Sequence, residues 1–321
     1  MSTITTDLNR AIHDLQQGKP VAIPTETVYG LAAPINNNTA IRTVFEMKNR
    51  PLNHPLIVHV APDWNLNELV EEIPDYAHQL ISKFWPGPMT LVFHCKKDKI
   101  NPLITGGQST IAIRCPAHPL TQKLLQQLEV PVVAPSANPF GKISPTTALH
   151  VKQSFKDKEL TILDGGRCHV GIESTIVDVT NPNLYQILRH GIIDEKIIAE
   201  TITTDYSTQK NTIRVPGKLD SHYQPDKTLY YFDCYEALSQ FCQQKEGIIY
   251  VIASQKPPTI AANYFHPLDK HPEKAAYDLY YQLRLADISD AICIAIELPP
   301  ENSEWEGVRE RIFKAGFPYT H

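Results

Sequence analysis

The chain has 321 residues, of which 42% are hydrophobic, and its formal net charge at pH 7 is -5. This length favours one large and one smaller domain, with enough apolar residues for packed cores. The negative charge argues against a protein that holds nucleic acid by bulk electrostatics, although it leaves room for a local basic pocket.

The sequence has no pattern typical of secretion or membrane insertion. The N-terminal stretch MSTITTDLNRAIHDLQQGKP lacks an apolar core segment, and no run of about 18 apolar residues occurs. The six cysteines are scattered without a C-x-x-C pair, as is typical of small buried side chains in a reducing compartment. We therefore expect a cytoplasmic protein that makes no membrane contact.

Residues 1–200 contain short runs rich in Val and Ile, typical of strands, with helical patterns between some of them. The predicted helices are Thr39–Lys48 and Pro119–Leu128. The predicted strands are Val21–Ile23, Leu56–Val60, Thr90–Cys95, Ser109–Arg114, Val130–Ala134, Leu160–Leu163, Thr175–Val179 and Tyr185–Leu188. Because several strands follow one another without a helix, the pattern favours a twisted, mixed α/β sheet over a doubly wound parallel one.

Residues 201–227 belong to a polar segment without periodicity that begins near Ala199. So long an irregular stretch is unusual inside a compact domain, so we predict a linker, and a functional lid if it packs over a site. Residues 228–321 then alternate strand and helix. The predicted elements are strands Thr228–Phe232, Gly247–Ala253 and Ala291–Ile296, and helices Tyr235–Gln244, Pro272–Ala286 and Trp305–Ala315.

This alternation predicts a small three-layer, Rossmann-like parallel α/β domain. It contains no G-x-G-x-x-G turn, so dinucleotide binding has no support. We expect Tyr277, Tyr280 and Tyr281 to pack along their helix rather than to stack on a ligand.

Thr25, Glu26 and Thr27 follow the first predicted strand, and Tyr29 and Gly30 come directly after them. Polar side chains gathered at a strand end are typical of a ligand-facing loop. An ordinary polar turn is the alternative interpretation.

Lys48 and Arg50 end a predicted helix just before Pro51, which forbids the helix from continuing. Two cations at this spacing can serve two phosphate oxygens, Arg through its planar fork and Lys as a point charge. The alternative is that they offset the helix macrodipole. No Walker A sequence occurs, so nucleotide binding would depend on side chains and strand-end loops.

The strand 109–114 places Thr110 and Arg114 on one face, next to a proline-terminated end. There Arg114 can bind a carboxylate through two hydrogen bonds, whereas an exposed surface strand is the alternative.

The loop APSANPFGKISPT carries Ser136, Asn138 and Ser144, whose small hydroxyl and amide groups suit ribose and phosphate contacts. Polar residues also border two later strands, in GIESTIVD around Ser174 and in ILRHG around Arg189. We therefore expect five strand ends to converge on one cavity.

Metal and covalent chemistry find less support in the sequence. The histidines, including His54 and His59, follow no zinc-ligand spacing, so structural or solvated roles are the better interpretation. Ser136 does not lie in a G-x-S-x-G elbow, which argues against nucleophilic serine chemistry.

Eight motifs together resemble the YrdC-like family over about residues 8–200. They are PTETVYGL, KNRPLNHPLIVH, FWPGPMT, STIAIR, PSAN, ISPT, ESTIVD and ILRHG, in the family's order. The linker sequence VPGKLDSHYQP is similar to the family's S-P-G-M-K-Y-R-H-Y-A-P signature, which marks a long form with an extra C-terminal domain. Val215, Lys218 and Ser221 depart from that signature, whereas His222 and Tyr223 match it.

The resemblance implies a threonylcarbamoyl-AMP synthase, which uses L-threonine, bicarbonate and ATP on the path to threonylcarbamoyladenosine in tRNA. It implies that Thr27, His59, Arg114 and Ser174 hold threonine. It implies that ATP is held by Lys48, Arg50, His54, Thr110, Ser136, Asn138, Ser144 and Arg189, with Tyr223 closing over it from the linker. The family often has asparagine where His54 stands. Lys48 and Arg50 would position the phosphates, and no residue is expected to act as a covalent nucleophile.

The same resemblance implies Mg²⁺ bound with ATP, without an identified protein ligand. The implied partners are a downstream tRNA threonylcarbamoyl transferase machinery and, more weakly, tRNA itself. Two alternatives stay open: another carbamoyl-adenylate-forming enzyme, and a non-catalytic RNA-binding module with a basic concave face.

Overall fold

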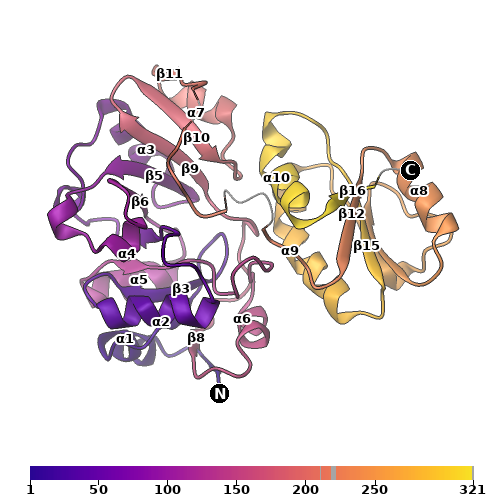
Figure 1. Cartoon of the computed structure of the whole chain (residues 1–321), viewed down its shortest axis with the longest axis horizontal. Helices are drawn as coiled ribbons and strands as arrows, with labels where there is room; N and C mark the ends of the chain where they lie inside the picture. The colour runs from indigo at the N-terminus through magenta and orange to yellow at the C-terminus, as the bar shows by residue number, and fades with distance from the viewer. Residues whose placement is uncertain (210, 218–221, 320–321) are drawn as a thin grey trace.

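The computed structural model describes residues 1–209, 211–217 and 222–319. Two α/β units lie side by side, each built on its own sheet (Figure 1). Lys218 and Ser221, two of the three departures from the linker signature, lie outside the described residues. No helix in the described ranges is long and apolar enough to span a membrane.

The first unit is built on an 11-stranded sheet with the order β1-β8-β2-β3-β7-β4-β6-β5-β9-β10-β11. Its strands are β1 (Thr3–Thr5), β2 (Val21–Ile23), β3 (Gly30–Pro34), β4 (Ile57–His59), β5 (Met89–His94), β6 (Thr110–Arg114), β7 (Val132–Val133), β8 (Thr161–Leu163), β9 (Thr175–Asn181), β10 (Leu184–Arg189) and β11 (Asp205–Tyr206). The sheet contains both parallel and antiparallel pairs. For example, β6 runs parallel to β4 on one side and antiparallel to β5 on the other. The predicted mixed α/β sheet is confirmed.

Residues 1–209 contain more helices than the two that the sequence predicted. They are α1 (Leu8–Gln16), α2 (Asn38–Lys48), α3 (Asp75–Phe84), α4 (Pro102–Thr105), α5 (Pro119–Leu128), α6 (Ala148–Ser154) and α7 (Glu195–Thr201). The additional helix α1 buries only Ala11, Ile12 and Leu15, so its apolar stripe is thin and easily overlooked.

Helix α2 shows how the chain ends an element at the site. The side chain of Asn37 accepts a hydrogen bond from the Ala40 amide and caps its start. The helix ends at Asn49, which adopts a left-handed φ of 52° two residues before Pro51. Lys48 therefore lies in the last turn, on the buried face of the helix.

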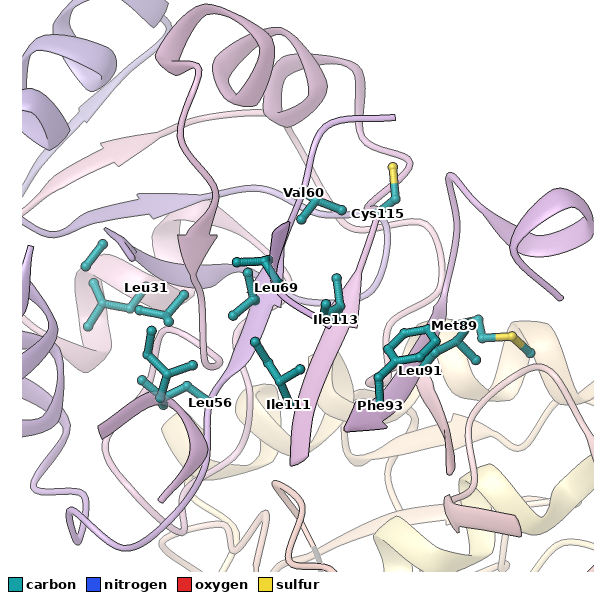
Figure 2. Packing of buried hydrophobic residues seen from close by; sticks show 14 of the residues in the cluster. Leu31, Leu56, Val60, Leu69, Met89, Leu91, Phe93, Ile111, Ile113 and Cys115 are labelled. Atoms are coloured by element: carbon teal, nitrogen blue, oxygen red, sulfur yellow. The ribbon is translucent and has the colours of Figure 1, made fainter. Parts of the chain in front are cut away.

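The central strands have one face in the main core and one face toward a cavity. On β6, Ile111 and Ile113 belong to the main apolar cluster, together with Leu91 and Phe93 of β5 (Figure 2). The intervening Ala112 belongs to a smaller cluster on the opposite face. This alternation agrees with the predicted placement of Thr110 and Arg114 on one face.

The second unit has a five-stranded, fully parallel sheet with the order β14-β13-β15-β12-β16. Its strands are β12 (Thr228–Phe232), β13 (Ile249–Ala253), β14 (Phe265–Pro267), β15 (Cys293–Glu297) and β16 (Phe317–Pro318), and its helices are α8 (Tyr235–Gln244), α9 (Pro272–Ile288) and α10 (Glu306–Ala315). Helix α8 packs on one face, while α9 and α10 pack on the face toward the first unit (Figure 1). The predicted three-layer domain is thus confirmed, with β14 and β16 as additional strands.

An apolar cluster continues from the second unit into the first. Val28, Ile143 and Ile172 of the first unit pack with residues of α9 and α10. At Gly171, a Cβ atom would lie 2.5 Å from the Ala276 carbonyl oxygen, so α9 approaches this loop very closely. The two units are therefore joined by a packed interface rather than by the linker alone.

The segment predicted as a linker is partly regular where the structure describes it. Helix α7 extends to Thr201, and β11 pairs with β10 in parallel. Further on, Val215 is buried against Ile57 and Ala112, on the cavity face of the sheet. The domain boundaries at 200 and 227 stay predictions.

Candidate functional site

A small cavity of about 50 Å³ lies where the linker covers the sheet of the first unit. Its lining residues are Thr25, Thr27, Val28, Gly30, Arg50, Ile57, His59, Arg114, Ala134, Pro135, Ser136, Glu173, Ser174, Arg189, Pro216, Gly217, His222 and Tyr223. The strand ends singled out in the sequence thus meet at one place. A more open groove between α6 and α9 contains none of the predicted site residues.

Arg114 is held in place by three groups at one wall of the cavity. Its Nε donates to the Gly87 carbonyl (3.2 Å), its Nη1 donates to Thr27 Oγ1 (2.8 Å), and its Nη2 lies 2.6 Å from Glu26 Oε1. A guanidinium has five N–H groups, so at least one on each terminal nitrogen is left over. Those two suit a carboxylate bound through both of its oxygens.

His59 is the direct neighbour of Arg114, because parallel pairing of β4 and β6 sets the two residues opposite each other. Its Nδ1 lies 3.3 Å from the Ile57 carbonyl oxygen. Burial, and secondarily the charge of Arg114, lowers the pKa of the imidazole to about 3. His59 is therefore neutral at pH 7 and adds no charge to this wall.

Ser174 and Arg189 form a second bonded pair in the cavity. Arg189 donates to the Ser174 carbonyl through Nε (3.1 Å) and Nη2 (2.9 Å), and Nη2 also lies 3.1 Å from Ser174 Oγ. The Ser174 hydroxyl oxygen lies 2.8 Å from Oγ1 of Thr90. Thr90 is a buried residue of β5 that the sequence analysis did not single out. Through Nη1, Arg189 reaches the Pro216 carbonyl of the linker (3.1 Å).

Lys48 lies behind the cavity wall and is 1% exposed. Its ammonium donates to the carbonyl oxygens of Ser136 and Asn138. Burial and the nearby charge of Arg50 hold its pKa well below the usual value. In this structure Lys48 fixes the loop that carries Ser136, instead of projecting into the cavity as a free cation.

Arg50 does line the cavity, beside an aromatic wall. Its Nη2 donates to the Pro55 carbonyl (2.8 Å), and its guanidinium carbon lies 5.5 Å from the Phe140 ring centre. Two histidine rings pack edge-on against Phe140: the ring centre of His54 lies 5.0 Å from that of Phe140, and the ring centre of His222 lies 5.8 Å from it. Burial lowers the pKa of Arg50 to about 10, so it stays charged at neutral pH.

The linker closes the cavity with His222 and Tyr223, whose rings lie 4.2 Å apart. Tyr223 is 1% exposed and adopts a φ of 61°, a left-handed conformation that costs a bulky residue free energy. Gly217 makes room for it, because a Cβ at that position would lie 2.3 Å from the Tyr223 hydroxyl. The fold thus holds Tyr223 over the cavity at a local cost.

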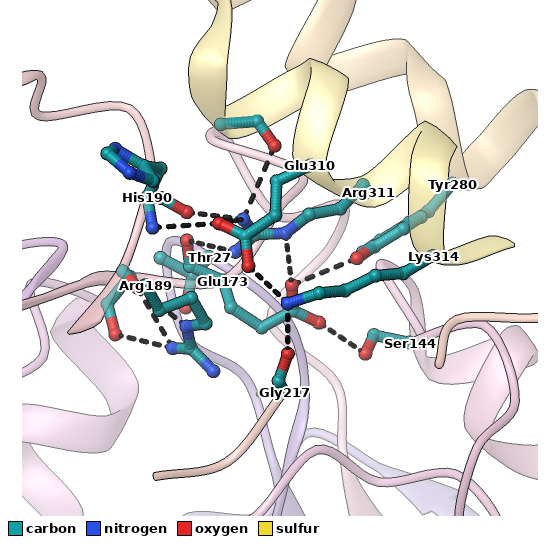
Figure 3. Close-up of polar contacts among 12 residues, drawn as sticks. Thr27, Ser144, Glu173, Arg189, His190, Gly217, Tyr280, Glu310, Arg311 and Lys314 are labelled. Carbon is teal, nitrogen blue, oxygen red and sulfur yellow. Dashed lines mark hydrogen bonds and ion pairs between the residues drawn. The ribbon is translucent and has the colours of Figure 1, made fainter. Parts of the chain in front are cut away.

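Glu173 is the one carboxylate among the lining residues that the structure describes. Ser144 Oγ donates to its Oε1 (2.5 Å), while the Tyr280 hydroxyl (2.9 Å) and Arg311 Nε (3.1 Å) donate to its Oε2 (Figure 3). Although burial raises the pKa of this carboxyl, Arg311 and Arg189 hold it at about 2. Glu173 is therefore ionised, and both of its oxygens already accept hydrogen bonds.

Four buried polar atoms around the cavity have no hydrogen-bond partner in the described part of the chain. They are Arg50 Nε, Asn138 Oδ1, His222 Nδ1 and the Tyr223 hydroxyl. A buried polar group without a partner costs about 1–3 kcal/mol, so such a concentration is typical of a ligand site.

Of the predicted site residues, eight line the cavity and five do not. Those in the lining are Thr27, Arg50, His59, Arg114, Ser136, Ser174, Arg189 and Tyr223, and those outside it are Lys48, His54, Thr110, Asn138 and Ser144. Three of the latter bond to lining residues or their loop: Lys48 to Ser136, Asn138 to the Lys142 carbonyl (2.8 Å), and Ser144 to Glu173.

Sequence reasoning assigned no role to several residues of the site. Glu26 and Glu173 stand inside recognised motifs, but nothing in their spacing reveals that one pairs with Arg114 and the other with Arg311. Tyr280 and Arg311 come from α9 and α10 of the second unit, far away in the chain. Among the described residues, no group of three or more His, Cys, Asp or Glu side chains could hold a metal ion.

The arrangement offers cationic and hydroxyl groups for binding anions. Arg50, Arg114 and Arg189 converge on one enclosed space, where the surrounding residues shield them from solvent. The described part of the lining contains no cysteine, and its two serines, Ser136 and Ser174, are not paired with a base in the way a serine nucleophile requires. Such a site suits positioning and charge stabilisation of a phosphate ester.

Comparison with known proteins gives two family matches that together cover most of the chain. Residues 13–191 match a Sua5, YciO and YrdC family described as "Telomere recombination". Residues 179–316 match a family described as "Threonylcarbamoyl-AMP synthase, C-terminal domain".

Individual relatives agree with these matches. A threonylcarbamoyl-AMP synthase of Pyrococcus abyssi is 43% identical over 66% of this chain, and the match spans 63% of that relative. A threonylcarbamoyl-AMP synthase of Bacillus subtilis is 32% identical over 98% of this chain and 94% of its own length. The crystal structure of P. abyssi Sua5 complexed with L-threonine superposes with a TM-score of 0.86, at 32% identity, over 98% of this chain and 97% of that one.

Proposed function

Because the chain belongs to the threonylcarbamoyl-AMP synthase family in its two-domain form, we propose that it converts L-threonine, bicarbonate and ATP into threonylcarbamoyl-AMP, pyrophosphate and water. The observation that carries the proposal is the convergence of Arg50, Arg114 and Arg189 on one enclosed cavity. Arg114 has N–H groups left for a carboxylate, and Arg50 Nε, His222 Nδ1 and the Tyr223 hydroxyl, which belong to lining residues, have no partner among the described residues and suit a nucleotide.

Threonine binds at the Arg114 wall in this proposal. The substrate carboxylate takes the remaining N–H groups of Arg114, while Thr27 and Ser174 offer hydroxyl groups beside it. The neutral imidazole of His59 accepts a hydrogen bond from threonine without repelling its ammonium group.

ATP binds on the other side of the cavity, toward the loop that carries Ser136. Arg50 and Arg189 contact phosphate oxygens, and Ser136 contacts the nucleotide directly. Tyr223 covers the nucleotide from the linker. Lys48, Asn138 and Ser144 support this half of the site from behind, since they hold the loop and Glu173. His54 and Thr110 stay proposed nucleotide contacts that would need a rearrangement on binding.

The chemistry needs no covalent enzyme intermediate. The threonine amine attacks the bicarbonate carbon, and loss of water gives a carbamate. A carbamate oxygen then attacks the α-phosphorus of ATP, the bond to the bridging oxygen breaks, and pyrophosphate leaves with its electron pair. The protein contributes alignment of the two substrates and positive charge near the phosphates.

We propose that Mg²⁺ reaches the site as the complex with ATP. The donor set favours this over a resident metal, because Glu173 is the only carboxylate in the described lining and its oxygens already accept three hydrogen bonds. The ion would screen the phosphate charges.

The product is an activated carbamoyl adenylate that water can hydrolyse. We propose that it passes to a tRNA threonylcarbamoyl transferase machinery in the cytoplasm, and that any direct tRNA contact is weak. The net charge of -5 supports a weak contact, because tight binding of tRNA phosphates needs a basic field.

The decisive experiment measures pyrophosphate release by the purified protein. We expect release from MgATP only when L-threonine and bicarbonate are both present, with threonylcarbamoyl-AMP identified by mass spectrometry. Release that is independent of threonine would point to a different carbamoyl-adenylate reaction. Salt-dependent RNA binding without any ATP turnover would favour the RNA-binding module instead.

A further inference from the structure

We propose that Arg311, on helix α10 of the second unit, is a positioning residue of the active site, which aligns Ser174 and Arg189 in the first unit and supports Tyr223. This inference rests on the proposed function, and it gives the second unit an indirect part in substrate binding, through the residues that it holds in place.

A single guanidinium reaches both strand ends that carry the two site residues. Arg311 Nε donates to Glu173 Oε2 (3.1 Å), and Nη2 lies 3.4 Å from the Glu173 carbonyl oxygen. Nη1 donates to the His190 carbonyl (Figure 3). Glu173 directly precedes Ser174, and His190 directly follows Arg189, so Arg311 clamps the two strand ends from outside.

The same guanidinium lies beneath the linker. Its central carbon is 5.5 Å from the centre of the Tyr223 ring, and the Tyr280 ring lies 5.7 Å from Tyr223 on another side. Arg311 and Tyr280 also share Oε2 of Glu173 as acceptor. The lid residue therefore packs on the same two side chains that hold Glu173.

Burial makes the interaction specific to arginine. Arg311 is 0% exposed. All three nitrogens of its planar guanidinium, Nε, Nη1 and Nη2, donate hydrogen bonds. A lysine would keep the charge but has no fixed fork, so it could not bond Glu173 and the His190 carbonyl together. A methionine would leave the Glu173 carboxylate buried without its main cation.

Other contacts hold the two units together without Arg311. Arg167 pairs with Asp278 (2.7 Å) and lies 3.6 Å from the centre of the Tyr277 ring. Arg284 donates to the Ile143 carbonyl (2.5 Å). Unlike these, Arg311 bonds the residues next to Ser174 and Arg189. Loss of Arg311 should therefore affect substrate binding beyond its effect on the interface.

The test compares Arg311→Lys and Arg311→Met with Arg167→Met, a matched loss of another arginine at the same interface. We measure the KM values for threonine and ATP, kcat by pyrophosphate release, and the melting temperature of each full-length protein. We expect Arg311→Lys to raise the threonine KM about tenfold or more, because charge-assisted hydrogen bonds are lost. We expect Arg167→Met to lower the melting temperature with unchanged KM values.

Two further measurements keep the proposal testable. If Arg311→Met does not fold, Tyr280→Phe removes only the hydroxyl bond to Glu173 and should give a smaller rise in the threonine KM. In the double variant Arg311→Met with Glu173→Gln, removal of the unpaired carboxylate should partly restore threonine affinity relative to Arg311→Met alone.

Amide hydrogen exchange separates this proposal from the proposed function, because it needs no substrate. Arg311→Lys should speed exchange of the amides at 173–175 and 189–191 more than in the Arg167→Met control. Equal exchange in both variants, or a threonine KM in Arg311→Lys equal to wild type, overturns the positioning role. Wild-type protein that releases no pyrophosphate overturns the proposed function alone.

Discussion

Glu26 and Arg114 form an ion pair with a separation of 2.6 Å at the wall of the cavity. The second carboxylate oxygen of Glu26 accepts a hydrogen bond from the Ala117 amide (2.9 Å), so the acid is fixed on both sides. Glu26 thereby orients the guanidinium before any substrate arrives. The Arg114 guanidinium is therefore already held in one orientation when a substrate carboxylate binds, which lowers the entropy cost of binding.

Arg114→Lys should weaken threonine binding much more than ATP binding. The substitution keeps a charge but loses the bonds to Thr27 and to a substrate carboxylate, at a cost of about 1.5–3 kcal/mol. We expect the threonine dissociation constant in calorimetry to rise roughly tenfold to a hundredfold. Glu26→Gln is the control for orientation and should give a smaller rise. Unchanged threonine affinity in Arg114→Lys would refute the carboxylate assignment.

Lys48→Met and Arg50→Met should separate loop support from nucleotide contact. Lys48→Met leaves the carbonyls of Ser136 and Asn138 without their donor and should lower the free energy of unfolding by about 1–3 kcal/mol. Both variants should raise the ATP KM, but we expect Arg50→Met to lose less stability, because Arg50 donates to one buried backbone carbonyl, that of Pro55, whereas Lys48 donates to two. Urea unfolding and ATP titrations check this. Wild-type ATP affinity in both variants would support the macrodipole interpretation.

Tyr223→Phe should leave the free protein as stable as wild type or more stable, because the hydroxyl that it removes is buried without a described partner. We expect the same variant to raise the ATP KM, since the nucleotide is the proposed partner of that hydroxyl. Tyr223→Ala, which also removes the ring, should lose net product through hydrolysis of the adenylate. A Tyr223→Phe variant with both lower stability and an unchanged ATP KM would contradict the lid assignment.

ATP and threonine together should protect the linker from proteases. Ligand supplies contacts that Tyr223 and His222 lack in the free protein, and a lid gains order when such contacts form. Limited trypsin digestion followed by mass spectrometry should show slower cleavage within 199–226 when both substrates are present. ATP with D-threonine is the control and should protect less. Equal cleavage rates with and without substrates would indicate a permanently closed tether.

Stability should fall as the pH drops below about 6.5. Burial lowers the pKa values of His59, His150 and His222 to about 3 in the folded protein. The unfolded chain therefore binds more protons between these two pH values, and each such histidine costs up to about 1.4 kcal/mol per pH unit. Urea unfolding between pH 7 and pH 4.5 should give this slope. His150→Gln, away from the cavity, should reduce the slope, and an unchanged slope would contradict this origin.

The local pattern of the chain was sufficient for much of the fold. Runs of Val and Ile marked β2, β4, β5, β6 and β8 to within a few residues, because side-chain alternation depends only on near neighbours. The alternation on β6 correctly placed Thr110 and Arg114 on the face opposite Ile111 and Ile113. The sequence analysis did not predict helix α1, because only three of its nine residues form the buried apolar stripe and most of the others are polar.

The sequence by itself also determined which strand ends carry polar side chains, and hence most of the cavity wall. Only the tertiary structure decided what each of these side chains does. Lys48 ends a helix as expected, yet the packing of that helix against the loop at Ser136 turns its ammonium away from the cavity. The bond between Glu173 and Arg311 joins residues 138 positions apart, one in the loop before β9 of the first unit and the other on helix α10 of the second. Such a contact depends on how the units pack together, a relationship that local spacing in the chain does not encode.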